Sequence, residues 1–476
     1  MTTRPFLLAW ADARPGAGLG HVVRTAALAQ AWTDAGGSAV LCTSSDEPAV
    51  EGILAAAAIP LERVDVGDEP RTREGATRFA RRAADAGAEW VSIDGYELDA
   101  SIDTIVRETG PRVVRIDDHV AGRRIDADVI VDQNLGADAR GPALGRGETL
   151  AGTRFALLRR PFRQRPSRPP GGHRLVVLLG GSPSDASLAF AATVIDRLPS
   201  SLAVDVVSNR RLPTQRKLAQ YDWLADVRPV LEQATVALSA AGSTVWELCA
   251  TGVVPVIFAA AANQQPVGVA LGEIGAASYL GPLCNADPDR AATVIEELIG
   301  DDLHREQMRT AGAATVDGLG ASRVVARLRA DLLRLRPATR ADVTLLFEWT
   351  NDAAVRAMSF STAAIAWDDH VRWLDDRLAR PHDRTYIAAD RDGNQIGLVR
   401  FDEIDANTVE IGVSVAATHR GRHWAAPLVV AGCRAVTTER HARVVHARVR
   451  AENVASIRAF AAAGFDHVGR QAADGY

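Results

Sequence analysis

The hydrophobic pattern of the chain is regular up to about residue 334. Short, uninterrupted apolar runs alternate with longer alanine-rich segments in which apolar residues recur three and four positions apart. The runs are typical of strands buried in a parallel sheet and the segments of amphipathic helices. The pattern predicts a doubly wound parallel sheet for the first part. Its strands are expected at 6–11, 39–43, 61–66, 89–94, 112–117 and 128–131, with a helix over 75–86.

A second series of the same kind starts near residue 173. Strands are predicted at 175–179, 236–239 and 254–258, with helices beginning near Asp185 and Thr244. The segment 163–172, rich in proline, glycine and arginine, reads as a linker between two sheets. We therefore expect one domain at 1–168 and another at 169–334.

The pattern changes after residue 334. Strands are predicted at 385–389, 396–401 and 409–415, and Asp392-Gly393-Asn394 provides the turn between the first two. Adjacent strands joined by a tight turn are antiparallel, so 335–476 is expected to form a third, mixed α/β domain.

Composition excludes some functions. The net charge is −5 and the arginines are interspersed with acids, which argues against nucleic-acid binding. The longest apolar run, Val253–Ala262, is too short for a membrane span, and the start lacks a signal segment, so a cytoplasmic protein is expected. The four cysteines lie far apart without metal-binding spacing, which predicts reduced thiols and no metal.

The first predicted strand runs into a glycine-rich bend before a helix that begins near His21. Free N–H groups at a helix start, with glycines that allow close approach, favour an anion such as a phosphate. His21 can move a proton there, and Arg24 can hold a negative charge. Such bends also occur in nucleotide-binding sheets without catalysis, but the glycine spacing here does not fit a dinucleotide-binding motif.

The segment Asp12-Ala13, followed by Gly18-Leu-Gly20-His-Val-Val-Arg24, resembles the signature of the UDP-2,4-diacetamido-2,4,6-trideoxy-beta-L-altropyranose hydrolases of pseudaminic acid biosynthesis. The resemblance implies catalytic roles for His21 and Asp12, and substrate binding by Gly18, Gly20 and Arg24. The chain has Trp10-Ala11 where that family has an arginine before the aspartate.

Polar clusters follow three predicted strands of the first sheet. Each alone could be an ordinary solvated turn, but strand ends of a parallel sheet share one edge, where ligands bind. Together the clusters resemble further signatures of the hydrolases, which implies substrate binding by Asp94, Tyr96, Asp118 and Asn134.

The second half repeats the strand, glycine turn and helix arrangement. Amides of Gly242, Ser243 and Thr244 can hold a diphosphate, and Glu247 can accept hydrogen bonds from ribose hydroxyls, although it could equally serve only the helix dipole. The half resembles the nucleotide-binding half of GT-B glycosyltransferases and of the hydrolases. The resemblance adds Gly181, Ser182, Asn263 and Gln264 as substrate-binding residues. Asp185 stands later than the family's aspartate and is expected only to cap a helix.

The third domain contains a loop, Thr418–Ala425, that directly precedes a predicted helix and is suited to the pyrophosphate of coenzyme A. The loop resembles the motif of GNAT N-acetyltransferases, and Asn453–Phe465 resembles their closing helix and strand. The resemblance implies acetyl-CoA as cosubstrate. Its expected binding residues are Val413, Val415, Arg420, Gly421, Arg422, His423, Trp424, Ala425, Asn453 and Ser456.

Two positions depart from the GNAT pattern. Phe460 replaces a tyrosine acid, and His423 replaces a glycine and is expected to crowd the loop. Glu410 could relay the proton of an amine through water, or could be an ordinary surface residue of a strand.

The sequence thus predicts two Rossmann-like parallel-sheet domains of GT-B type followed by a GNAT domain. The expected activities are inverting, metal-independent hydrolysis of a UDP-amino sugar with His21 as base, and acetylation of the 4-amino group of such a sugar. Two alternatives stay open: a glycosyltransferase that uses an acceptor alcohol, and a GNAT domain that binds acetyl-CoA without catalysis.

Overall fold

The computed structural model describes residues 4–14, 18–118, 124–141, 144–164, 166, 173–222, 224, 226–380, 382–440 and 442–469. The chain forms two compact units. The first comprises Arg4–Ala321, and the second begins at Ser322. No helix among the described residues is both long and apolar enough to cross a bilayer.

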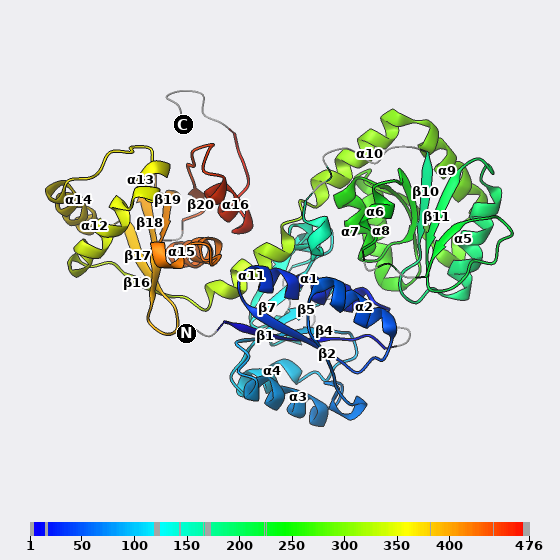
Figure 1. The fold of residues 1–476 in the computed structure, drawn as a ribbon, viewed down its shortest axis with the longest axis horizontal. Helices are drawn as coiled ribbons and strands as arrows, with labels where there is room; N and C mark the ends of the chain where they lie inside the picture. Colours follow the sequence, from blue (N-terminus) through cyan, green and yellow to red (C-terminus); the bar gives the residue numbers. More distant parts are fainter. Residues whose placement is uncertain are drawn as a thin grey trace. The chain divides into compact units, whose positions relative to one another are not determined.

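The first unit begins with a sheet whose strands are all parallel. Helices α1 (Gly20–Asp34) and α2 (Pro48–Ala57) cover one face, and α3 (Arg73–Asp85) and α4 (Ile102–Glu108) cover the other (Figure 1). We call this sheet with its helices the first lobe. The order across the sheet is β3 (Leu61–Arg63), β2 (Ser38–Thr43), β1 (Phe6–Ala11), β4 (Trp90–Asp94), β5 (Arg112–Ile116), β7 (Val129–Asp132) and β9 (Glu148–Ala151).

The strand order places the ligand-binding edge. The chain moves from β1 outward to β2 and β3, and then returns to β4 on the other side of β1. At such a switch point the loops after the two adjacent strands diverge and leave a crevice. His21 lies at the start of the helix that follows β1, and Tyr96 lies in the loop after β4, so the topology brings them together.

The second lobe follows the predicted linker at 163–172, of which only residues 163, 164 and 166 are among the described residues. Its sheet is also parallel, and its switch point lies between β10 and β13. The order is β12 (Ala219–Tyr221), β11 (Ala203–Val207), β10 (Arg174–Leu178), β13 (Val236–Ala240), β14 (Val254–Ala259) and β15 (Ser278–Pro282).

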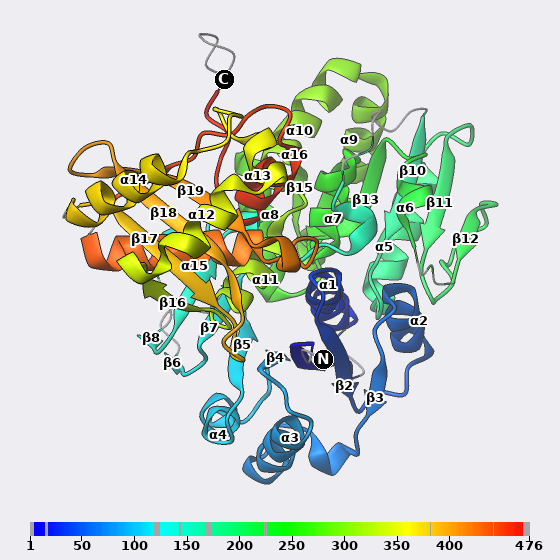
Figure 2. The same ribbon diagram turned by 60° about the vertical axis from the view of Figure 1, so that its left-hand side comes forward.

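Alternate residues of the central strand β10 face two different cores. Leu175 and Val177 pack with α5 (Asp185–Arg197) and α9 (Pro288–Gly300). Val176 and Leu178 pack on the opposite face with α7 (Thr244–Thr251) and α8 (Gln265–Glu273). This two-sided burial is why the strand reads as an uninterrupted apolar run. Figure 2 shows the second sheet with these helices around it.

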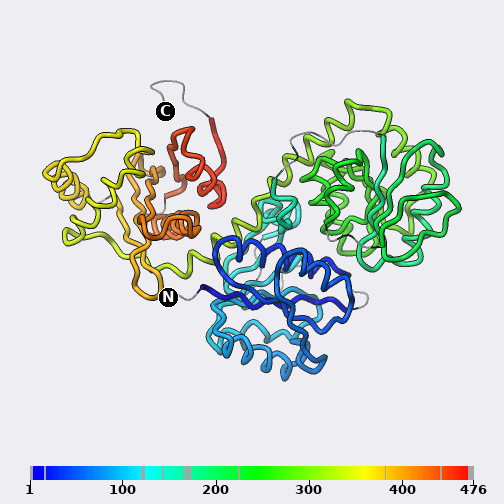
Figure 3. The backbone as a smooth tube through the Cα atoms, viewed as in Figure 1, coloured from blue at the N-terminus to red at the C-terminus, as the bar shows by residue number. Residues whose placement is uncertain are grey.

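After the second sheet the chain returns to the segment that precedes the linker between the two lobes. Helix α10 (Asp302–Thr315) leads to a turn in which Gly318 and Gly320 touch backbone atoms of Arg163 and of Phe155 and Ala156. A Cβ atom at Gly320 would lie 2.3 Å from the carbonyl oxygen of Ala156. Figure 3 traces this path along the backbone.

The second unit is built on a mixed sheet. Its strands are antiparallel except for β19 and β20, which are parallel. The order is β16 (Arg334–Pro337), β17 (Arg384–Ala389), β18 (Gln395–Glu403), β19 (Thr408–Val415) and β20 (Val444–His446). The helices are α11 (Gly320–Ala330), which crosses from the first unit, α12 (Val343–Asn351), α13 (Ala353–Met358), α14 (Trp367–Ala379), α15 (Ala425–Arg440) and α16 (Val454–Ala462).

The predicted fold class is therefore confirmed: two Rossmann-like parallel sheets are followed by a mixed α/β unit. The division into domains at 1–168, 169–334 and 335–476 stays a prediction. Strand β9 was not predicted, because it is a short edge strand with only Leu150 fully buried.

Candidate active site

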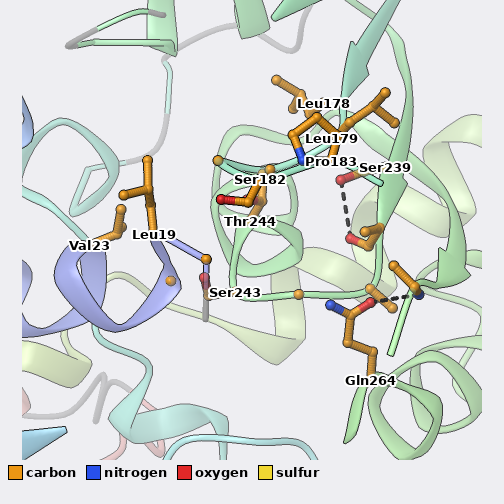
Figure 4. A pocket seen from close by; sticks show the side chains of 18 of the residues that line it. Leu19, Val23, Leu178, Leu179, Ser182, Pro183, Ser239, Ser243, Thr244 and Gln264 are labelled. Carbon is orange, nitrogen blue, oxygen red and sulfur yellow. Dashed lines mark hydrogen bonds between the residues drawn. The ribbon is translucent and has the colours of Figure 1, made fainter. Parts of the chain in front are cut away.

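A cavity of about 880 Å³ lies in the first unit, lined by loops at the carboxyl edges of both sheets. Every substrate-binding residue predicted in the two lobes lines it except Asp94. In Figure 4, Leu19 and Val23 of α1 and its preceding loop face Ser182, Ser243 and Thr244 of the second lobe. The lining includes Gly18, Gly20, His21, Arg24, Tyr96, Asp118, Asn134, Gly181, Ser182, Gly242, Ser243, Thr244, Glu247, Asn263 and Gln264.

His21 sits in the first turn of α1 and is held by Asp94, the last residue of β4. Its Nδ1 lies 2.6 Å from Oδ1 of Asp94, and both residues are buried. A carboxylate at this distance needs a donor, so we assign the proton of neutral His21 to Nδ1. The other ring nitrogen, Nε2, is then left as a proton acceptor.

Arg24 keeps Asp94 ionised. Its guanidinium donates to both oxygens of Asp94, at 2.6 and 2.7 Å, and reaches Asp118 at 2.5 Å. Burial raises the pKa of Asp94, but the positive charge of Arg24 and the hydrogen bonds from Arg24 and His21 outweigh it and lower that pKa to about 2. Asp94 is therefore a fixed negative charge behind the histidine.

Asp118 has one oxygen left for a ligand. Its Oδ2 accepts hydrogen bonds from Arg24 and from the Tyr96 hydroxyl, the latter at 2.9 Å. Its buried Oδ1 has no hydrogen-bond partner within the described ranges. Burial, and then the negative charge of Asp118, raise the pKa of Tyr96, so its hydroxyl stays protonated and can donate. Asp118 lines the cavity, and a carboxylate oxygen without a partner suits a donor such as a hydroxyl or an amide N–H.

Asp12 does not contact the histidine. Its carboxylate is bound by Arg14, at 3.2 Å, and by Arg71, at 2.8 Å, and it lies outside the cavity lining. Burial raises the pKa of Asp12, but hydrogen bonds from the two arginines outweigh this effect, so the pKa lies below its usual value. The arrangement fits a residue that fixes the end of β1, and the predicted catalytic role of Asp12 has no contact with His21 to support it.

The second lobe presents its glycine turn at the start of α7. Gly242, Ser243 and Thr244 border the cavity, and Ser243 Oγ would lie 3.5 Å from a Cβ atom at Gly20. Opposed turns of this kind place backbone N–H groups and a helix N-terminus beside any anion in the cavity.

Glu247 lies one helical turn further and is paired with a residue that the sequence did not single out. Arg159, from the segment before the linker, donates to Oε1 of Glu247 from Nε at 2.9 Å and from Nη2 at 2.8 Å. Glu247 is buried but lines the cavity. Because Arg159 contacts Oε1, Oε2 keeps more capacity to accept a hydrogen bond from a hydroxyl group in the cavity.

Asn263 and Gln264 have separate contacts. Asn263 donates from Nδ2 to the Tyr96 hydroxyl at 3.4 Å, a long hydrogen bond between the lobes. Gln264 accepts from the N–H of Ala260 at 2.9 Å and thereby stiffens its own loop (Figure 4).

The expected helix cap at Asp185 is wrong. Ser184 caps α5 by accepting from the N–H of Ser187, while Asp185 is exposed and pairs with Arg210 at 2.5 Å. Sequence reasoning also missed Ala49 and Ile53 of α2, which line the cavity with apolar atoms. Nothing in their spacing distinguishes them from ordinary core positions.

The second unit places the predicted pyrophosphate loop between β19 and α15. Arg420 pairs with Asp352 at 2.8 Å and donates to the carbonyl of Val415. Gly421 and His423 both have left-handed backbone conformations, with φ of 73° and 58°. The imidazole of His423 is exposed. The histidine thus adopts the conformation for which a glycine is preferred, and its side chain points outward.

Strand β19 offers an open edge next to this loop. Among the described residues its pairing with β20 ends at Glu410 and His446, whereas β19 continues to Val415. Val413 and Val415 lie on this part of the strand, where the carbonyl of Val415 already accepts a hydrogen bond from Arg420, and a ligand can lie along the edge near Val413.

Two other predicted residues, Asn453 and Glu410, have protein partners, and so does Phe460, which departs from the GNAT pattern. Asn453 caps α16 by accepting from the N–H of Ser456. Both oxygens of Glu410 accept hydrogen bonds from Arg448, at 2.8 and 3.0 Å. Phe460 is buried against Phe465, so its position supplies no acid. Among the residues that the structure describes, no cluster of histidine, cysteine and carboxylate side chains could hold a metal ion.

Comparisons with known proteins bear on the second unit. Residues 333–466 match the acetyltransferase (GNAT) domain family. A comparison with curated protein sequences gave no match. Among solved structures, spermidine N-acetyltransferase from Vibrio cholerae in complex with CoA and spermine is 20% identical, with 31% of this chain and 88% of that chain covered and a TM-score of 0.29. MurG from Acinetobacter baumannii is 15% identical over 68% of this chain and 99% of that chain, with a TM-score of 0.47. The domain match identifies the carboxyl-terminal unit as a GNAT acetyltransferase domain, for which acetyl-CoA is the cosubstrate.

Proposed function

We propose that the first unit hydrolyses a UDP-linked 2,4-diacetamido-2,4,6-trideoxy sugar of the pseudaminic acid type and releases UDP. The observation that carries the proposal is the His21–Asp94 pair at 2.6 Å, whose histidine lines a cavity that is also lined by an opposed glycine turn and Glu247. A base on one side and an anion site on the other are what hydrolysis of a sugar diphosphate needs.

In the proposed reaction, a water molecule gives a proton to Nε2 of His21 while its oxygen attacks the anomeric carbon. The bond between C1 and the glycosidic oxygen breaks, and its electron pair leaves with UDP. Asp94 stabilises the imidazolium that forms, because it is ionised and touches Nδ1. Attack opposite to the leaving group inverts the anomeric centre.

The second lobe would hold the leaving group. Amides of Gly242, Ser243 and Thr244 face the cavity beside the N-terminus of α7, where negative charge is stabilised. Glu247 would accept the ribose hydroxyls. Asp118 and Tyr96 would contact hydroxyl or acetamido groups of the sugar.

The decisive experiment is mass spectrometry of the reaction in heavy-oxygen water. Attack at carbon puts the heavy oxygen into the free sugar and leaves UDP unlabelled, whereas label in UDP would indicate attack at phosphorus and contradict the proposal. If UDP appears only when an acceptor alcohol is added, the first unit is a glycosyltransferase that shares the same cavity.

A substitution of the base provides the second test. His21→Asn should lower kcat by at least about a hundredfold, the usual contribution of a general base. His304→Asn, at an exposed position in α10, is the matched control and should retain normal turnover. Near-normal turnover of His21→Asn would contradict the assignment.

For the GNAT domain we propose transfer of an acetyl group to the 4-amino group of the same class of UDP-sugar. The amine nitrogen attacks the thioester carbonyl, the carbon–sulfur bond breaks, and coenzyme A leaves as its thiol. Glu410 is the candidate acceptor for the amine proton, because its carboxylate keeps free lone pairs beside the two hydrogen bonds from Arg448. Incubation with the 4-amino UDP-sugar and acetyl-CoA tests this, since binding of acetyl-CoA without release of the thiol would indicate a non-catalytic module.

A further inference from the structure

Helix α11 contributes to the predicted coenzyme A loop although it lies outside the matched family segment. The match begins at residue 333, whereas α11 ends at Ala330. From Ser322 onward the helix belongs to the same compact unit as the GNAT sheet. Its last turn carries Arg329, which is 2% exposed.

Arg329 contacts the loop in two ways. Its guanidinium donates to the carbonyl oxygens of Arg422 and His423, at 3.3 and 3.5 Å. Its Cζ atom lies 4.3 Å from the ring centroid of Trp424, a cation–π distance. Burial lowers the pKa of Arg329 to about 10, so the group still carries its charge at neutral pH.

These contacts fix the peptides on both sides of a strained residue. The carbonyl groups of Arg422 and His423 flank the Cα atom of His423, whose φ is 58°. A left-handed conformation costs a residue other than glycine about 1 kcal/mol or more. The two hydrogen bonds, although long, are made by carbonyl groups in the orientation that the left-handed backbone gives, and so favour it.

The same contacts orient possible anion donors. In a trans peptide the N–H group points away from the C=O group. Carbonyls turned toward Arg329 therefore direct the N–H groups of His423 and Trp424 to the opposite side of the loop. Successive N–H groups on one side of a turn form an anion-binding concavity.

We propose that Arg329 is a positioning residue for the pyrophosphate of coenzyme A, and that the loop of this GNAT domain is completed by a helix from outside the family segment. Arg329 acts through the loop and does not touch the ligand. Its charge behind the loop also adds a favourable potential for the diphosphate. The inference rests on coenzyme A binding by the GNAT domain.

The test uses the full chain and two ligands, coenzyme A and pantetheine, which lacks the pyrophosphate. Arg329→Met should raise the Kd for coenzyme A by about tenfold in calorimetry, as expected for loss of charge-assisted hydrogen bonds that hold the loop. The Kd for pantetheine should stay unchanged. Arg329→Lys keeps the charge without the planar guanidinium, and should give a smaller selective loss even if the methionine variant folds poorly.

Arg323→Met is the matched control. Arg323 is also a buried arginine of α11, but it donates to the carbonyl of Ala461, at 3.2 Å, away from the loop. It should leave both Kd values unchanged. Equal weakening of coenzyme A and pantetheine by Arg329→Lys, or no weakening of either, would overturn the inference. Failure of the unaltered protein to bind coenzyme A would instead contradict the proposed function of the domain.

Discussion

Replacing Asp94 by asparagine tests the central contact of the hydrolase site. The amide keeps the size of the carboxylate but removes the charge that binds His21 and Arg24. Arg24 donates to both oxygens of Asp94, so either orientation of the amide places its NH₂ group against an N–H donor of Arg24. The asparagine therefore cannot satisfy both neighbours.

The size of the effect follows from the pKa of Asp94. The shift from its usual value of 3.8 to about 2 corresponds to about 2 kcal/mol of stabilisation of the folded state. Because the folded pKa is lowered, this stability is present above about pH 4 and disappears as the pH falls toward 2. Asp94→Asn should lose about 2 kcal/mol at neutral pH and show a weaker loss of stability on acidification.

The effect on turnover should be larger. Without the carboxylate the imidazole loses its fixed tautomer and the charge that stabilises its protonated form, and kcat should fall by about a thousandfold or more. Kinetics of UDP release and denaturant unfolding measure the two effects separately. Asp103→Asn is the matched control, since Asp103 is also buried in the first lobe and pairs with Arg115 at 3.3 Å outside the cavity. If Asp94→Asn retained normal kcat while losing stability like the control, Asp94 would be only a structural residue.

Three further predictions concern the cavity and the thiols. Gly181→Ala would place a Cβ atom 2.4 Å from Cγ of Leu19, so UDP-sugar binding, measured by titration calorimetry, should weaken by about 1–3 kcal/mol. The additional change Leu19→Ala should restore binding, and a failure to restore it would contradict the steric explanation. Glu247→Gln removes the charge beside the expected ribose site, so KM should rise about tenfold with little change in kcat, whereas an unchanged KM would show that Glu247 does not meet the substrate. Cys284 is exposed, whereas burial raises the pKa of Cys433 to about 12, so alkylation in mildly alkaline buffer should modify Cys284 first. Peptide mass spectrometry identifies the modified residue, and early labelling of Cys433 would contradict this order.

The architecture was predictable because its signals are local. Strand β1 was placed at residues 6–11 from one apolar run, and the structure gives the same bounds. The start of α5 at Asp185 also agrees, although the cap is Ser184, since a serine directly before a helix competes equally well for that position. Edge strands such as β9 were not predicted, because a strand with one buried side chain shows little alternation of apolar and polar residues.

Motifs at the ends of predicted strands identified the residues that line the cavity. The residues that pair with them were not identified from the sequence. Arg159 meets Glu247 across 88 positions of sequence, and Arg329 meets the loop at His423 across 94 positions. No local pattern identifies either arginine as a site residue, because the apolar and polar residues around each are spaced as in ordinary helices and turns. Their roles depend on how the segments pack.

The sequence alone determined that the chain has two parallel-sheet lobes with glycine turns and a final mixed sheet, since side-chain period and turn residues are encoded by neighbours in the chain. It also placed His21 at the start of a helix. Only the tertiary structure decided which carboxylate holds that histidine. Asp12 is nine positions away, but β1 lies beside β4 and pairs Ala11 with Asp94, so the last residue of β4 reaches His21 while the arginines bind Asp12. Strand order, which is a property of the whole sheet, made that choice.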